Sequence, residues 1–179
     1  HLVLVTGTSP QDREWEAQLR REVLRFTARV HPEFLAGLTT PAVQQRLAQL
    51  KDDTVVFAAG YFRDGDGREF TPRDAVQGMT AVSGAPVYAA FNTFIGTGVV
   101  GGYMLDYRGM GRQAALAVND HLHGTRLAQA PAARAMPNAL NVDWRQVRRW
   151  AIDERAIPDN AVVHYREPSL WDAHRSEVM

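Results

Sequence analysis

Six polar or aromatic residues lie in three short groups, each just after an apolar run, and together they could bind a small molecule. They are Thr8, Ser9, Tyr61, Arg63, Asn92 and Thr93. Hydroxyl, amide and guanidinium groups hydrogen-bond to a small ligand, and the tyrosine ring can stack on it. Thr8 and Ser9 also precede a predicted helix, whose N-terminal N–H groups favour a carboxylate or another anion. The three groups are therefore predicted to form a ligand-binding site, in which Ser9 also caps the helix.

Catalysis and metal binding have no candidate residues in this sequence. No nucleophile, base and orienting residue occur together among the six positions. The absence of cysteine excludes thiol chemistry, disulfides and cysteine–zinc sites. His121 and His123 lack the spacing that places two ligands on one helical face, and Asp64–Gly67 lacks the closing glutamate of a calcium loop. We therefore predict a binding domain with no metal and no cofactor, and not an enzyme.

Gly96–Gly101 matches the G-x-G-x-x-G pattern of dinucleotide-binding proteins. That pattern binds a pyrophosphate where it joins a strand to a helix N-terminus. Here a loop precedes the pattern, and Gly102–Leu105 is poor helix material. Flexible backbone is the favoured interpretation, and a nucleotide-binding α/β enzyme is kept as a second alternative. A phosphoacceptor receiver domain is rejected, because Thr6–Thr8 and Gly60–Tyr61 stand where its acidic residues would be.

The elements that must position these residues follow a repeated order of apolar run, loop and Ser/Thr-Pro. Ser or Thr caps a helix, and proline suits its first position. The expected strands are Leu2–Val5, Val30–Leu35, Val55–Ala59, Pro86–Phe91 and Val99–Tyr107, and the expected helices are Pro10–Thr27, Pro41–Leu50 and Pro72–Ser83. They predict a three-layer parallel α/β sheet of flavodoxin-like order 2-1-3-4-5, with the proline-bearing second strand at its edge. Such a sheet would bring Thr8, Tyr61 and Asn92 together at the carboxyl ends of its strands.

The pattern changes after Phe91. We expect a helix over Met110–Leu122, a linker over Thr125–Asn138, a helix over Val142–Ile152 and a strand over Ala161–Tyr165. The predicted division is an α/β ligand-binding lobe over residues 1–105, and a crossing helix, linker and tail over residues 106–179.

Charge and hydropathy exclude several partners. Lys+Arg and Asp+Glu both number 20, so nothing indicates nucleic acid or an anionic membrane. No apolar run approaches the roughly 20 residues of a membrane span. The chain begins at His1 directly in a predicted strand, so we expect a fragment of a longer protein.

Two sets of segments resemble a known family over nearly the whole chain. The first set is Leu4-Val5-Thr6-Gly7-Thr8-Ser9, Asp53-Thr54-Val55-Val56-Phe57, Pro86-Val87-Tyr88, Gly98, Asp106-Tyr107 and Gly111-Arg112-Gln113-Ala114. It resembles the second half of type I periplasmic solute-binding proteins, in particular the ABC-type substrate-binding family that includes aromatic amino-acid binders. The tail, Asp143–Trp150 with Arg166–Trp171, looks like the extracytoplasmic sensor region of bacterial histidine kinases, where it leads into a membrane helix.

This resemblance implies one lobe of a periplasmic, membrane-attached sensor domain in two-component signalling. A small molecule would bind between two lobes, with no catalysis, and closure would be transmitted to a kinase. The alternative is the solute-binding protein of an ABC importer. Family ligand contacts map to Thr8 and Ser9, Gly60 and Tyr61, and Phe91–Thr93. Phe91 and Gly60 depart from the acidic and polar residues that amino-acid binders carry there, so the ligand class stays open.

The resemblance also implies that the first lobe of the same protein is missing. In the family, the helix that matches Met110–Leu122 returns to that lobe. We therefore expect its apolar face, with Ala114, Ala117, Val118 and Leu122, to be covered by another chain, a swapped element or a repositioned helix. A homodimer is one such arrangement.

Overall fold

The computed structural model describes residues 1–51, 53–123 and 137–166. Its strands are β1 (Leu2–Thr6), β2 (Pro32–Leu35), β3 (Val55–Gly60), β4 (Val87–Ala89), β5 (Gly101–Leu105), β6 (Asn138–Asp143) and β7 (Val162–His164). Its α-helices are α1 (Pro10–Val23), α2 (Thr40–Ala48), α3 (Pro72–Val82), α4 (Tyr107–Leu122) and α5 (Trp144–Arg149), and its 3-10 turns are η1 (Leu24–Phe26), η2 (Asn92–Phe94) and η4 (Glu154–Ala156). Most of the linker expected over Thr125–Asn138 lies outside these residues.

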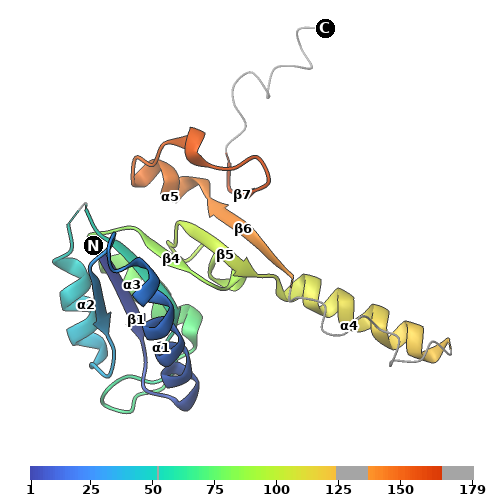
Figure 1. The fold of residues 1–179 in the computed structure, drawn as a ribbon, viewed down its shortest axis with the longest axis horizontal. Helices are drawn as coiled ribbons and strands as arrows, with labels where there is room; N and C mark the ends of the chain where they lie inside the picture. The colour runs from blue at the N-terminus through green and yellow to red at the C-terminus, as the bar shows by residue number, and fades with distance from the viewer. Residues whose placement is uncertain (52, 124–136, 167–179) are drawn as a thin grey trace, which may run out of the picture.

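The strands form one sheet in the order β2-β1-β3-β4-β5-β6-β7 (Figure 1). Strands β1 to β5 run parallel, β6 is antiparallel to β5, and β7 is parallel to β6. This confirms the predicted fold class and the order 2-1-3-4-5, with β2 at the edge. Because β1, β3 and β4 are parallel neighbours, the loops that follow them lie at one edge of the sheet.

Three capped helices connect the parallel strands. Ser9, Thr39 and Thr71 each accept a hydrogen bond from the backbone of the first turn, and a proline occupies N1 or N2 of each helix. Ser9 forms a capping box with Asp12, since each side chain bonds to the other's backbone N–H. The Ser/Thr-Pro pairs therefore begin helices, as the sequence predicts.

The main core lies between the sheet and helices α2 and α3. Alternate strand residues such as Val3, Val5 and Val56 pack with Leu47 and Met79. Neighbouring strand residues face the other side of the sheet, where α1 contacts β1 and β3. Trp15 belongs to this α1 layer.

After residue 105 the helix predicted over Met110–Leu122 is present as α4 and the strand predicted over Ala161–Tyr165 as β7, but the region between them differs from the prediction. Asn138–Asp143 is strand β6, and α5 begins only at Trp144, where the Asp143 carboxylate accepts from the N–H of Arg145. A second, smaller core contains Val100, Val142 and Val147, and it packs α5 against the part of the sheet formed by β6. In Figure 1, α4 projects away from the sheet, and it contains no buried residue.

Candidate ligand-binding cleft

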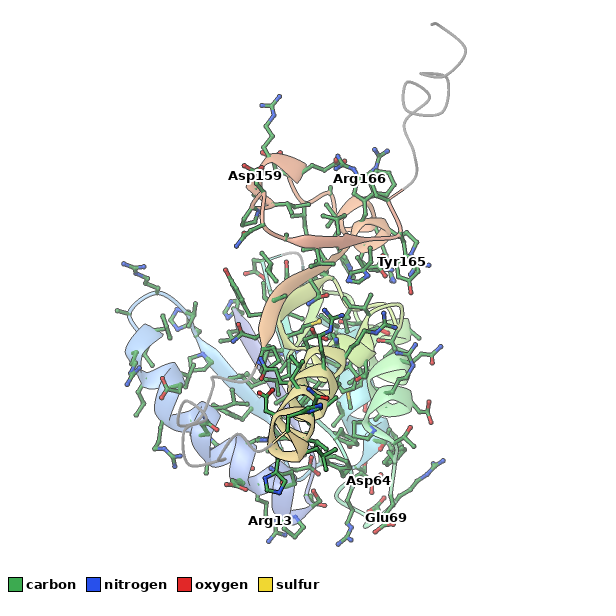
Figure 2. The ribbon with its side chains drawn as sticks, turned by 90° about the vertical axis from the view of Figure 1, so that its right-hand side faces the viewer. Arg13, Asp64, Glu69, Asp159, Tyr165 and Arg166 are labelled. Atoms are coloured by element: carbon green, nitrogen blue, oxygen red, sulfur yellow. The ribbon has the colours of Figure 1, made fainter. Side chains whose placement is uncertain are left out.

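A cavity of about 270 Å³ lies at the carboxyl ends of the parallel strands. Phe62 follows β3, Phe91 follows β4, and α1, η2 and α4 each add an aromatic ring. Among the described residues, the lining is Trp15, Phe62, Thr71, Pro72, Arg73, Phe91, Thr93, Phe94 and Tyr107. We call this cavity the aromatic cleft. Side chains at this end of the molecule include Arg13, Asp64 and Glu69, opposite the end that carries Asp159, Tyr165 and Arg166 (Figure 2).

The aromatic rings of the cleft form one continuous cluster. Ring centroids are 5.5 Å apart for Trp15 and Phe91 and 5.9 Å apart for Trp15 and Phe62. Phe91 stacks on Tyr107 at 6.0 Å and 15°, and Phe94 meets Phe91 edge-on at 5.5 Å and 69°. Phe62 and Tyr107 remain 38% and 47% exposed. The cluster therefore presents open aromatic surface on which a planar ligand can stack.

Gly60, the last residue of β3, positions the indole of Trp15. A Cβ atom at this glycine would lie 1.9 Å from Cζ3 and 2.6 Å from Cε3 of Trp15. The indole therefore packs directly on the backbone of β3, in space that any side chain would fill. A glycine here is needed for close approach rather than for an unusual backbone conformation.

Asp12 joins the first turn of α1 to the loop after β3. Its carboxylate is 0% exposed and accepts from the N–H of Ser9 at 3.0 Å and from the N–H of Phe62 at 3.1 Å. A buried carboxylate is tolerated where backbone N–H groups saturate it. Asp12 thereby fixes the backbone from which the Phe62 ring enters the cleft.

The base of α4 is tied to the strands that carry Phe91. The Asn92 amide donates to the Asp106 carboxylate at 3.1 Å. The N–H of Leu105 donates to the carbonyl of Ala90 at 2.9 Å. These bonds hold Tyr107, the first residue of α4, against Phe91.

Arg73 is the charged side chain of the cleft wall. Its Nη1 donates to the carbonyl of Thr93 and, at 3.5 Å, to that of Ile95. Within residues 1–51, 53–123 and 137–166 its guanidinium makes no ion pair. The carbonyls hold Arg73 in place without neutralising its charge.

The sheet brings the three predicted groups to one edge, but only Thr93 lines the cleft. The hydroxyl of Thr8 donates to the carbonyl of Asp64 at 2.7 Å, and Ser9 is engaged in its capping box. Arg63 pairs with Glu69 at 2.8 Å. Asn92 lies behind the cleft wall, bonded to Asp106.

Tyr61 is 1% exposed and belongs to the core. Its hydroxyl lies 3.3 Å from that of Thr40, and its ring is 5.7 Å from Phe70. Burial raises the pKa of Tyr61, so the phenol stays neutral over the ordinary pH range. Its chain neighbour, Phe62, faces the cleft instead.

Eight of the nine cleft residues fall outside the six predicted site residues, although the family resemblance maps a ligand contact to Phe91. They are Trp15, Phe62, Thr71, Pro72, Arg73, Phe91, Phe94 and Tyr107. Trp15 falls within the helix predicted over Pro10–Thr27, where its spacing with Leu19, Val23 and Phe26 predicts only an apolar stripe. Phe62 and Phe91 each stand directly beside a predicted site residue. The available signal is an aromatic residue at the second position after each of two neighbouring strands.

The Gly96–Gly101 segment leads into strand β5 rather than a helix. A Cβ at Gly98 would lie 2.6 Å from the hydroxyl oxygen of Thr80, so this glycine serves close packing. The geometry that receives a pyrophosphate is therefore absent from this segment. In the described part of the chain, no group of three or more His, Cys, Asp or Glu residues is placed to hold a metal.

Two other cavities lie away from the cleft. One, of about 280 Å³, is at the amino ends of the strands and is lined by polar groups that include His1, His31 and Glu33. The other, of about 340 Å³, lies beside β7 and includes Trp144, Glu154 and Arg166. Ligands of parallel α/β sheets bind at the carboxyl ends of the strands, so the aromatic cleft is the better candidate.

Comparisons with solved structures identify the fold. No family model and no curated protein matches the sequence. A substrate-binding protein with adhesive properties from Clostridium difficile, in a ligand-free open form, matches with a TM-score of 0.66 and 13% identity over 93% of this chain and 54% of that one. An ABC domain in complex with L-Trp from Streptococcus pneumonia matches with a TM-score of 0.62 and 12% identity over 90% and 54%. A conserved domain protein from Vibrio cholerae matches with a TM-score of 0.60 and 18% identity over 90% and 53%.

The chain therefore has the α/β fold of one lobe of a periplasmic binding protein. It spans about half the length of the solved structures that it matches. Among the described helices, none has both the length and the apolar character needed to cross a membrane.

Proposed function

We propose that this chain is one lobe of a two-lobed, non-enzymatic substrate-binding domain that holds a small molecule in the aromatic cleft. The observation that carries the proposal is the open aromatic surface at the carboxyl edge of the sheet, where Phe62 and Tyr107 leave ring area uncovered. The cleft, at about 270 Å³, is slightly smaller than a typical ligand pocket of about 300–1,000 Å³. A cleft of this size that is open on one side is what we expect of half of a binding site, with the other half supplied by a second lobe.

The projecting helix α4 supports the presence of a second lobe. Leu116, Val118 and Leu122 are 50%, 59% and 76% exposed. Apolar side chains gathered on one projecting helix favour contact with another protein surface. We propose that the missing lobe, reached through α4, covers this helix and closes the cleft by a hinge motion. The division into residues 1–105 and 106–179 belongs to this proposal.

For the predicted site residues we propose one direct contact and five supporting roles. Thr93 would contact the ligand from the cleft wall. Thr8, Ser9, Tyr61, Arg63 and Asn92 would hold the loops that carry the aromatic rings, through the hydrogen bonds and ion pair described above.

The finer role that we favour is delivery of a substrate to an importer, outside the cytoplasm. Two of the similar structures are described as a substrate-binding protein and as an ABC domain, which supports this role. A sensor domain in two-component signalling is the second candidate, and it rests on the resemblance of the tail, Asp143–Trp150 with Arg166–Trp171. The flanking gene sequence separates them. A membrane helix and kinase encoded downstream would support the sensor, and a stop codon there would support the importer.

Binding to the cleft is testable with the full-length gene product. We expect calorimetric screening of aromatic small molecules to find a ligand whose affinity falls about tenfold on Tyr107→Ala, which corresponds to about 1.4 kcal/mol of lost stacking. Tyr103→Ala is the matched control, because Tyr103 is 68% exposed on β5 and does not line the cleft. A broad small-molecule library without any binder, or equal losses in both variants, would refute the proposal.

A further inference from the structure

The charges around the aromatic cleft are unequal. Among the described residues, its lining contains one arginine and neither aspartate nor glutamate. A ligand cation placed among the rings would therefore meet no counter-charge on the wall, whereas a ligand anion would meet Arg73. This asymmetry bears on the chemical class of the ligand, and the inference rests on the proposed function.

Three carboxylates close in sequence to cleft residues are engaged elsewhere, and Glu14 and Glu16, which flank Trp15, do not line the cleft either. Asp12 accepts from the backbone N–H groups of Ser9 and Phe62. Asp106 accepts from Asn92, and its Oδ2 packs close to Gly109 in the first turn of α4, 2.5 Å from where a Cβ of residue 109 would lie. Asp74 accepts from the hydroxyl of Thr71. None of the three lines the cleft, so an ammonium group bound there would lose water without gaining an ion pair.

Arg73 is suited to a carboxylate. A guanidinium has five N–H donors in a planar fork that matches a carboxylate, and the carbonyls of Thr93 and Ile95 are met by Nη1 alone. These carbonyls orient the side chain while its charge remains uncompensated among the described residues. The remaining donors are available to a ligand at the rim, next to the rings.

Cation–π attraction is the main argument for a cationic ligand, and the geometry disfavours it. An aromatic cage turns several ring faces toward one cation. Here Phe91 and Tyr107 are stacked nearly parallel on each other, and Trp15 packs on the backbone of Gly60. A neighbour thus covers one side of Phe91, of Tyr107 and of Trp15, and the positive charge of Arg73 at the rim repels a second cation.

We infer that the cleft selects a planar aromatic ligand that carries an anionic group, such as a carboxylate, and disfavours ligands that carry an ammonium group. The ring stacks on the exposed faces of Phe62 and Tyr107, and the anion pairs with the guanidinium of Arg73. An aromatic acid without an amino group satisfies both contacts and leaves no charge unpaired.

Matched probes test this inference on the full-length gene product by calorimetric titration. Indole-3-propionate, L-tryptophan and tryptamine share the indole ring and a two-carbon chain. They carry a carboxylate, a carboxylate with an ammonium, and an ammonium, respectively. Choline tests for a cation-selective aromatic cage. We expect indole-3-propionate to bind most tightly and tryptamine at least tenfold more weakly. Arg73→Gln should reduce the affinity for indole-3-propionate about tenfold and raise that for tryptamine, because the charge that repels the ammonium group is removed. Arg13→Gln, the same change outside the cleft lining, should alter neither.

The outcomes separate this inference from the proposed function. Tryptamine, L-tryptophan or choline binding as tightly as indole-3-propionate would overturn the anion selectivity while leaving a small-molecule site in place. Failure of all four probes would also overturn the inference, whereas the proposed function fails if the broad library contains no binder or if Tyr107→Ala and Tyr103→Ala lose affinity equally. Equal losses in Arg73→Gln and Arg13→Gln would refute the role of Arg73.

Discussion

Gly60→Ala tests whether close contact between Trp15 and β3 organises the cleft. The added Cβ would lie 1.9 Å from Cζ3 and 3.1 Å from Cη2 of Trp15, so the indole must move. Moving it weakens two aromatic pairs, with Phe62 and with Phe91, at about 0.5–1.5 kcal/mol each. Alanine in a strand recovers about 0.5–1 kcal/mol relative to glycine. We expect a net loss of about 1 kcal/mol, and at most about 2.5 kcal/mol, in the free energy of unfolding.

Urea unfolding followed by circular dichroism measures this loss, and a double-variant cycle assigns its cause. Trp15→Leu removes the ring atoms that the new Cβ would meet. In that background Gly60→Ala should be neutral or stabilising by up to about 1 kcal/mol, because only the strand preference of alanine remains. Gly78→Ala is the matched control in α3, where the nearest atom is the flexible amide end of Gln44 at 3.3 Å. The same destabilisation with and without Trp15 would refute the reasoning.

Three further predictions concern the loops beneath the cleft and the projecting helix. Asp12→Ala should destabilise the protein by about 2–4 kcal/mol in a urea titration, because it leaves two buried N–H groups without an acceptor. Glu14→Ala, at an exposed position of the same helix, should change stability by less than about 0.5 kcal/mol. Burial alone would raise the pKa of Asp64, but hydrogen bonds from Thr40, Arg68 and Asp66 outweigh it and hold that pKa below its usual 3.8. The stability that the ionised Asp64 contributes is therefore complete above pH 3.8 and is lost as pH falls through the lower pKa of the folded state. Asp64→Asn should accordingly make the free energy of unfolding fall less steeply with pH in the acid range. Solution X-ray scattering of this chain should show α4 covered by a second copy or another segment, and a monomer with the helix bare would contradict that expectation.

The parallel half of the fold was predictable because its signals are local. Leu2–Val5 and Val55–Ala59 are apolar runs between turn residues, and each Ser/Thr-Pro pair carries both a cap and a helical first residue. Pro32 alone places its strand at an edge. The sequence did not indicate β6, because Asn138–Asp143 alternates polar and apolar residues only briefly and owes its place to antiparallel pairing with β5.

The site was predictable in position but not in composition. Strand order fixes the edge at which the loops after β1, β3 and β4 meet. That order follows from the repeated pattern of apolar run, loop and Ser/Thr-Pro. Which side chains face the cleft depends on single residues at the strand ends. Tyr61 points into the core toward Thr40, so Phe62 points outward. No composition or spacing rule distinguishes these two orientations before the turn is known.

Spacing on α1 couples the stability of this edge to its binding surface. Asp12 and Trp15 are three residues apart and therefore lie on one face of the helix. Asp12 bonds to the backbone of Phe62, and Trp15 packs on Gly60 and on the ring of Phe62. One helical turn thus anchors the loop after β3 and supplies the floor of the cleft. The apolar stripe that predicts a core helix therefore also contains a ring that lines the cleft, because α1 begins at the carboxyl edge of the sheet, beside the loops that follow the strands.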